Sequence, residues 1–267
     1  MTASISRHLG IAFQYILQAL KMRLEYRADF FIECVAALMQ QAAGLLMLLF
    51  LFRNISGLKE WRWEEVLFIH GFSLLPRSFF DAFAMGLYGF SDKYIVQGEM
   101  DRCLLRPLST LFQVMLEGFS LDFIADLILG LSILTYASIK LGHSWDAIQV
   151  LWVMAFIFGG WGVLTGVFVS LTSMAFWSQD RLAVVPPVYN LLEFSRFPLN
   201  IFNKLVSFLL TFIIPFGFLS YYPSSALLGK GEMTWLAFAS PLAGLICLLV
   251  AGLLWKKGLQ KYSGAGS

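Results

Sequence analysis

Long apolar segments recur along the whole chain, and the polar stretches between them are too short to fold into a water-soluble domain. An α-helix needs about 20 mainly apolar residues to cross the hydrocarbon core of a membrane. Only 13% of the 267 residues are charged, whereas soluble domains contain about a quarter. The sequence therefore predicts an all-α integral membrane protein in which residues 1–267 form a single transmembrane domain. Six membrane-spanning helices are expected, at about residues 30–52, 64–90, 112–139, 148–177, 204–218 and 235–255.

The N-terminal residues 4–27 are interrupted by polar side chains too often for a membrane span. Their apolar residues recur with helical spacing, whereas Arg7, Gln14 and Lys21 lie largely off the apolar stripe. This pattern predicts an amphipathic helix that lies in the membrane interface, with its basic residues toward the lipid headgroups. A poorly apolar transmembrane span is the alternative interpretation.

Residues 217–231, before the last predicted span, are unusually aromatic and apolar for a loop. They contain Tyr221 and Tyr222, and they follow a helix break at Pro215. Irregular backbone is tolerated at membrane depth only where protein surrounds it. We therefore expect a re-entrant element on the outer side, which enters the membrane and returns to the same face.

The distribution of Lys and Arg predicts the orientation of the chain. With the N-terminus inside, 13 basic residues fall on the inner side and five on the outer side, and Arg77 falls within a span. An excess of basic residues marks the cytoplasmic face. Both termini, and the polar residues 91–110 between the second and third spans, are therefore expected in the cytoplasm.

Several classes of function lack the residues that they require. The net charge of +2 is small and not gathered in a patch, which argues against nucleic acid as a partner. The three cysteines and three histidines have no metal-ligand spacing, so no metal site is expected. No phosphate-binding loop is present, because Gly229-Lys230-Gly231 lacks the preceding glycine. We expect this chain to bind no cofactor and to be no enzyme.

Charged residues inside the predicted spans are the first candidate site. A charge at the centre of a membrane costs about 2.5 to 3.5 kcal/mol and requires a partner. Arg77 has Asp81 one helical turn away, and Asp126 lies at a similar depth in the third predicted span. We predict an ion pair between Arg77 and Asp126, with Asp81 and Asp122 close by. Polar lining of a translocation path is the alternative role for these residues.

The second candidate site is the polar segment between the second and third spans. Its charged side chains could pair with a soluble subunit, and Leu104 and Leu105 could fill a groove on that subunit. An ordinary solvated loop is the alternative. The residues that we expect to contact such a soluble subunit are Gly98, Glu99, Asp101, Arg102, Leu105, Arg106 and Pro107.

Short patterns along nearly the whole chain resemble, in order, those of type-2 ABC exporter permeases, within a bacterial group of ABC-type permeases. The matching residues are Gly98, Asp101, Leu105, Arg106, Pro107, Leu108 and Gln113; Pro187, Tyr189 and Ser195 to Pro198; Ile214 to Phe218, Ser220 to Pro223, Leu228 and Gly229; and Gly258, Leu259, Tyr262 and Ser263.

The resemblance implies a multi-pass subunit of the bacterial inner membrane that moves cargo out of the cytoplasm. It also implies a second permease, identical or related, and separate ABC ATPase subunits that carry ATP and Mg²⁺. The 26 phenylalanines would suit an amphipathic or hydrophobic cargo, although contact with membrane lipid is the commoner explanation for such residues. An ion-coupled secondary transporter, using the break at Pro215 and the charges of Arg77 and Asp126, is the alternative function.

Overall fold

The computed structural model confirms that the chain is all-helical. It describes residues 27–54, 61–121, 123–178, 184–230 and 233–264, together with residues 10, 14, 17, 18 and 21. Every secondary-structure element of these residues is a helix. The interfacial helix predicted over residues 4–27 lies almost wholly outside the described residues, so it stays a prediction.

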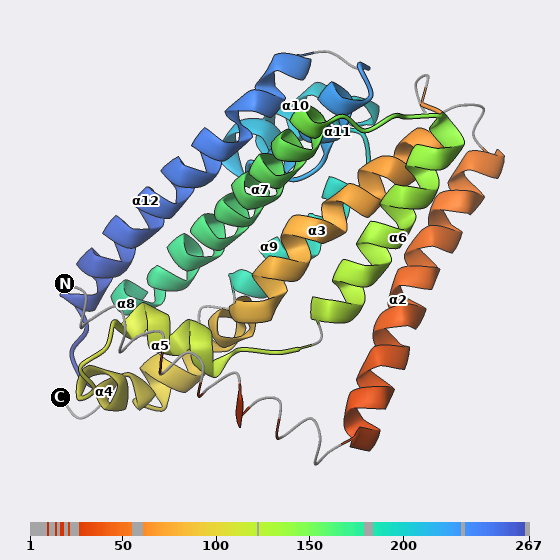
Figure 1. Ribbon diagram of the computed structural model, residues 1–267. Helices are drawn as coiled ribbons and strands as arrows, with labels where there is room; N and C mark the ends of the chain where they lie inside the picture. Colours follow the sequence, from red (N-terminus) through yellow and green to blue (C-terminus); the bar gives the residue numbers. More distant parts are fainter. Residues whose placement is uncertain are drawn as a thin grey trace.

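Five long helices form the body of the molecule (Figure 1). They are α2 (Arg27–Asn54), α3 (Trp63–Tyr88), α6 (Phe123–Leu141), α7 (Ala147–Ser173) and α12 (Ser240–Leu259). Helix α3 packs against both α6 and α7, α7 packs against α12, and α2 contacts α6 at the edge. Helix α3 is therefore the central helix, and side chains such as Phe68, Phe72 and Phe80 are buried in the core.

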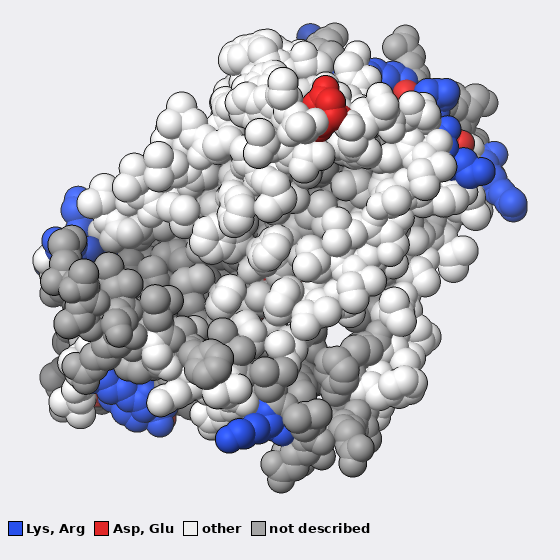
Figure 2. Space-filling view, viewed as in Figure 1, with Lys and Arg blue, Asp and Glu red and all other residues white. Residues whose placement is uncertain are grey.

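Within the described part of the chain, three helical stretches are long and apolar enough to cross a membrane, namely Phe123–Leu141, Ala147–Ser178 and Thr234–Leu259. On the face shown in Figure 2, charged side chains lie toward the two ends of the molecule, with an uncharged band between them. This arrangement suits a multi-pass membrane protein. Helices α2 and α3 have 28 and 26 residues but fall outside this set, so the six-span topology stays a prediction.

The last part of the chain before α12 contains a sharply bent pair of helices. The segments Lys204–Ile213 and Phe216–Leu227 are together long and apolar enough to cross a membrane, and they meet at an angle of 78°. Proline lacks the N–H that would continue a helix, and Pro215 lies at the break. The second segment ends in α11 (Tyr221–Leu227), which is mostly buried. This geometry fits either a broken span or the predicted re-entrant element.

The third predicted span, residues 112–139, is wrong as a continuous helix. Helix α5 (Thr110–Glu117) ends at Gly118, and α6 begins only at Phe123. Helix α5 packs against α3 and the short helix α4 (Glu99–Leu104). A Cβ at Gly86 of α3 would collide with the carbonyl oxygen of Val114 in α5, so the glycine allows this close crossing. The apolar composition of residues 112–118 thus reflects burial against α3.

Helices α7 and α12 meet along a row of small residues. Gly159 and Gly162 lie against the backbone of Ser240 and Gly244, and Gly166 lies against Cys247. Small residues at this spacing allow membrane helices to approach until their backbones touch.

We expect Gly166→Ala to destabilise the protein, because a Cβ at Gly166 would collide with both the backbone and the side chain of Cys247. Overpacking of this kind costs about 1 to 3 kcal/mol. Gly252→Ala in α12 is the matched control, because a Cβ there meets no atom within 4 Å. Thermal unfolding in detergent would show a lower midpoint for Gly166→Ala alone. Equal midpoints for the two variants would contradict the close packing of α7 on α12.

Candidate functional site

The polar segment after α3 folds into a compact turn structure. It comprises the π-helical residues Ser91–Val96, the short helix α4 (Glu99–Leu104) and the start of α5. Gly98 separates the first two with φ of 75°, in the left-handed region that glycine adopts most readily. The chain reverses here, and α4 and α5 lie together at one end of the helical bundle (Figure 1).

Glu117, at the end of α5, holds this segment together. Its Oε2 atom lies 3.3 Å from Lys93 Nζ and accepts a hydrogen bond of 2.7 Å from the Tyr94 hydroxyl. Its Oε1 atom lies 3.4 Å from Arg106 Nη1 and 3.7 Å from Arg102 Nη2. The Glu117 side chain is only 12% exposed. One carboxylate thus joins three cations from separate turns of the segment, and we call these five residues the Glu117 cluster.

Contacts within the Glu117 cluster shift the pKa values of Glu117 and Tyr94. Burial alone would raise the pKa of Glu117, but hydrogen bonds from Tyr94 and Lys93 and the positive charges of Lys93 and Arg102 outweigh it. The pKa of this carboxyl is therefore held below its ordinary value. Burial and the hydrogen bond to Glu117 raise the pKa of Tyr94, so the tyrosine stays a neutral donor.

The lowered pKa predicts how the segment responds to acid. The ionised Glu117 carboxylate stabilises the segment fully above pH 4.5, the ordinary pKa of this group. This stabilisation is lost as the pH falls through the lowered pKa of Glu117. We expect amide hydrogens of residues 91–110 to lose protection against exchange below about pH 4. In Glu117→Gln the protection is expected to be weaker at neutral pH and to change little with acid. Equal acid sensitivity in both proteins would contradict this role of Glu117.

The inner side of the segment contacts the helical bundle. Gln113 Nε2 donates to the carbonyl oxygens of Cys103 at 2.9 Å and Leu108 at 3.2 Å. Trp255, near the end of α12, donates from Nε1 to Thr110 Oγ1 at 3.0 Å. These bonds fix the segment to α5 and α12.

The outer side presents the side chains predicted to contact a soluble subunit. Leu105 is 87% exposed and Leu104 is 47% exposed, although both are apolar. Glu99 and Arg102 form a surface ion pair of 2.8 Å. Of the seven predicted residues, Arg102 and Arg106 belong to the Glu117 cluster. Gly98, Asp101 and Pro107 shape the same turn structure without joining it.

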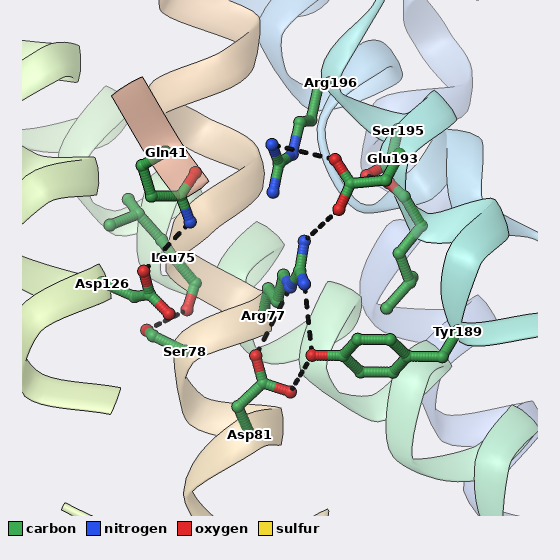
Figure 3. A network of polar contacts seen from close by, with 11 residues as sticks. Gln41, Leu75, Arg77, Ser78, Asp81, Asp126, Tyr189, Glu193, Ser195 and Arg196 are labelled. Atoms are coloured by element: carbon green, nitrogen blue, oxygen red, sulfur yellow. Dashed lines mark hydrogen bonds and ion pairs between the residues drawn. The ribbon is translucent and has the colours of Figure 1, made fainter. Parts of the chain in front are cut away.

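The other candidate site, the charged residues predicted inside the spans, is centred on Arg77 (Figure 3). The Arg77 side chain donates from Nε to Asp81 at 3.4 Å, from Nη1 to Glu193 at 3.0 Å and from Nη2 to the Tyr189 hydroxyl at 3.1 Å. The Tyr189 hydroxyl in turn donates to Asp81 at 3.0 Å. All three directions of the guanidinium group are therefore occupied.

This geometry corrects the predicted pair between Arg77 and Asp126. The Asp126 carboxylate accepts a hydrogen bond of 3.0 Å from Gln41 of α2, while the ion-pair partners of Arg77 among the described residues are Asp81 and Glu193. Because α6 begins at Phe123, Asp126 lies in its first turn and not at the centre of a span. Asp122 lies outside the described residues.

Arg196 extends the network to α2. Its Nη1 atom pairs with Glu193 at 2.9 Å, and a Cβ at Gly44 of α2 would lie 3.0 Å from the same atom. Its Nε and Nη2 atoms are buried, as are both ring nitrogens of His70, and none of the four has a hydrogen-bond partner in the part of the chain that the structure describes. Buried donors of this kind normally bind ordered water or a ligand.

Sequence reasoning missed Tyr189, Glu193 and Arg196 as partners of Arg77. They lie on α9 (Val185–Asn190) and the 3₁₀ helix Leu191–Arg196, which were not among the six predicted spans. The available signal was their spacing, because positions 189, 193 and 196 fall on one face of a helix.

The model of the "ABC-2 family transporter protein" family matches residues 38–266 of the chain. The chain belongs to the ABC-2 transporter family. Comparisons with curated proteins and with solved structures gave no match. Family membership makes the chain a membrane permease of an ABC transporter and implies ABC ATPase subunits as its partners.

The geometry of each candidate site suits a different role in this ABC-2 permease. The described residues contain no group of three or more metal-ligating side chains. The polar turn structure at residues 91–110 exposes apolar and charged side chains, which suits contact with a soluble subunit. The Arg77 network is charge-paired, and its two arginines are buried. This suits a structural link between α3 and the helices before α10 (Lys204–Phe208).

Proposed function

We propose that this ABC-2 permease is the membrane-spanning subunit of an ATP-driven exporter in the bacterial inner membrane. It moves an amphipathic or hydrophobic cargo out of the cytoplasm, with both termini on the cytoplasmic side. Separate ATPase subunits carry ATP and Mg²⁺, and this chain binds no cofactor and catalyses no reaction. A second permease, identical or related, completes the membrane part.

The observation that carries the proposal is the Glu117 cluster beneath an exposed Leu105. A segment that transmits force must keep its shape when a partner pushes on it. The cluster holds residues 91–110 in place because Lys93, Arg102 and Arg106 all pair with Glu117. Leu105 is 87% exposed and its neighbour Leu104 is 47% exposed, so two apolar side chains are available to enter the apolar core of an interface.

Co-purification tests the proposal directly. The permease is extracted from its native membrane in mild detergent, and we expect a soluble ATPase to accompany it. Leu105→Glu is expected to reduce the amount of bound ATPase at least tenfold, because a carboxylate replaces the apolar contact. The control is Met233→Glu, which changes an apolar residue that is 56% exposed at the other end of the bundle. Equal ATPase recovery with both variants would exclude Leu105 from the contact.

An ion-coupled secondary transporter is the second candidate, favoured by the helix pair bent by 78° and by the buried charges around Arg77. Such a transporter would move cargo in vesicles that contain the purified permease alone, driven by an ion gradient. The exporter would need the ATPase and ATP. Cargo movement without any ATPase would therefore replace our proposal with this alternative.

A further inference from the structure

A pocket of about 300 Å³ lies at the end of the bundle opposite to α4 and α5. It is formed where α3 begins, where α6 is connected to α7 and where α11 ends (Figure 1). Pockets that hold small ligands begin at about this volume. Its lining residues are Arg62, Glu65, Leu141, Gly142, His143, Ser144, Gln149 and Leu228.

The pocket lies at the boundary between membrane and water. Helices α6 and α7 are both long and apolar enough to cross a membrane, so the short connection between them, residues 142–146, must lie at the membrane surface. Trp145 in this connection stacks on Phe68 with ring centroids 6.0 Å apart. Tryptophan is enriched at the depth of the lipid headgroups. The pocket is therefore at the level where lipid phosphate groups lie.

The carboxylates at the pocket already accept hydrogen bonds from other groups. Glu65 is the carboxylate among its lining residues, and its Oε2 atom already accepts from Lys230 Nζ at 2.6 Å and from the Arg62 backbone N–H at 2.7 Å. The Arg62 Nε atom lies 3.5 Å from the other oxygen of Glu65. Two cations thus surround one carboxylate. The nearby Asp146 carboxylate caps α7, accepting from the Gln149 N–H at 2.7 Å.

Two side chains provide donors for an anion. The Arg62 side chain is 68% exposed at the mouth of the pocket. The His143 Nε2 atom is buried and has no hydrogen-bond partner among the described residues. Phe68 and Trp145 fix the His143 ring by edge contacts, with centroid distances of 6.0 and 4.7 Å. An arginine fork beside a fixed imidazole is the donor chemistry that recognises phosphate.

We propose that this pocket binds a phosphate group, with Arg62 and His143 as its donors, and that a phospholipid headgroup supplies the phosphate in the membrane. His143 donates from Nε2 when that nitrogen carries the ring proton. Gly142, with φ of 65° and no atom within 4 Å of a Cβ at that position, leaves open space beside the pocket. The site is independent of the proposed export function, because it lies at the other end of the molecule.

Binding to the purified permease in detergent tests this site in two arms. The first arm measures retained phosphatidylglycerol by native mass spectrometry, and the second measures inorganic phosphate by calorimetry. Arg62→Gln with His143→Gln is expected to weaken binding at least tenfold, because two charge-assisted or buried hydrogen bonds are lost. Lys140→Gln is the matched control, since Lys140 is exposed beside the same connection but does not line the pocket.

Each outcome decides the proposal. Variant-sensitive lipid binding supports a headgroup site, and variant-sensitive binding of inorganic phosphate alone assigns the same pocket to a soluble anion. Binding that is equal in the double variant and the wild type in both arms overturns the site. Thermal unfolding verifies that each variant is folded. The single change Arg62→Gln, at an exposed side chain, replaces the double variant if the latter does not fold.

Discussion

Replacing Glu117 with alanine is expected to unfold residues 91–110 locally and to abolish coupling to the ATPase. The change leaves Lys93, Arg102 and Arg106 without their shared carboxylate and the Tyr94 hydroxyl without its acceptor. Hydrogen bonds to a charged group contribute about 1.5 to 3 kcal/mol each, and repulsion between the three cations adds to the loss. Hydrogen exchange of the segment and ATP hydrolysis by the assembled complex measure the two effects.

Glu99→Gln is the matched control for this prediction. Glu99 lies in the same segment and pairs with Arg102 at 2.8 Å, but both side chains of this pair are solvent-accessible. Surface pairs contribute about 1 kcal/mol or less. We therefore expect faster exchange over residues 91–110 in Glu117→Ala and little change in Glu99→Gln. Identical exchange in the two variants would show that Glu117 does not hold the segment.

Arg77→Ala is expected to destabilise the protein by about 3 to 5 kcal/mol, because it leaves buried Asp81 without its cation. The double change Arg77→Ala with Asp81→Ala is expected to recover a large part of this loss. Arg77→Ala with Asp126→Ala is expected to recover none, since Asp126 is bonded to Gln41. Thermal unfolding of the single and double variants gives the two coupling energies.

The comparison of the two double variants distinguishes two pairings. Rescue by Asp126→Ala would support the pair predicted from the sequence, and rescue by Asp81→Ala supports the network seen in Figure 3. Glu193 keeps a cation in every variant, because Arg196 pairs with it at 2.9 Å. The outcome therefore depends on Asp81 and Asp126 alone.

The long helices were predictable because the length of an apolar run sets the length of a membrane helix. Residues 64–90, 148–177 and 235–255 correspond to α3, α7 and α12 within a few residues. The length of the apolar run did not predict that residues 112–139 are divided between the two helices α5 and α6. Residues 112–118 are as apolar as a span, and only their packing against α3 at Gly86 shows that they form a separate helix.

The candidate sites were predictable in part. Glu99 to Pro107 stand out because they are polar between two apolar runs, and Arg77 stands out because it is charged within one. Asp81 was expected beside Arg77, and the two side chains do pair, but the partners that are distant in sequence were missed. Glu117 is 24 residues from Lys93, and Glu193 is 116 residues from Arg77. Helical periodicity reports neighbours within one or two turns, so contacts across such separations need the tertiary structure.

The hydrogen bond between Trp255 and Thr110 joins the polar segment to the far end of α12. Helix α12 in turn touches α7 backbone to backbone at Gly159 and Gly162, which leaves no layer of side chains between them to slide. A displacement of Thr110 would therefore move α12 and α7 together as one rigid unit. The opposite end of this pair carries the α6–α7 connection, so a displacement at one end of the bundle would reach the other end without any helix bending.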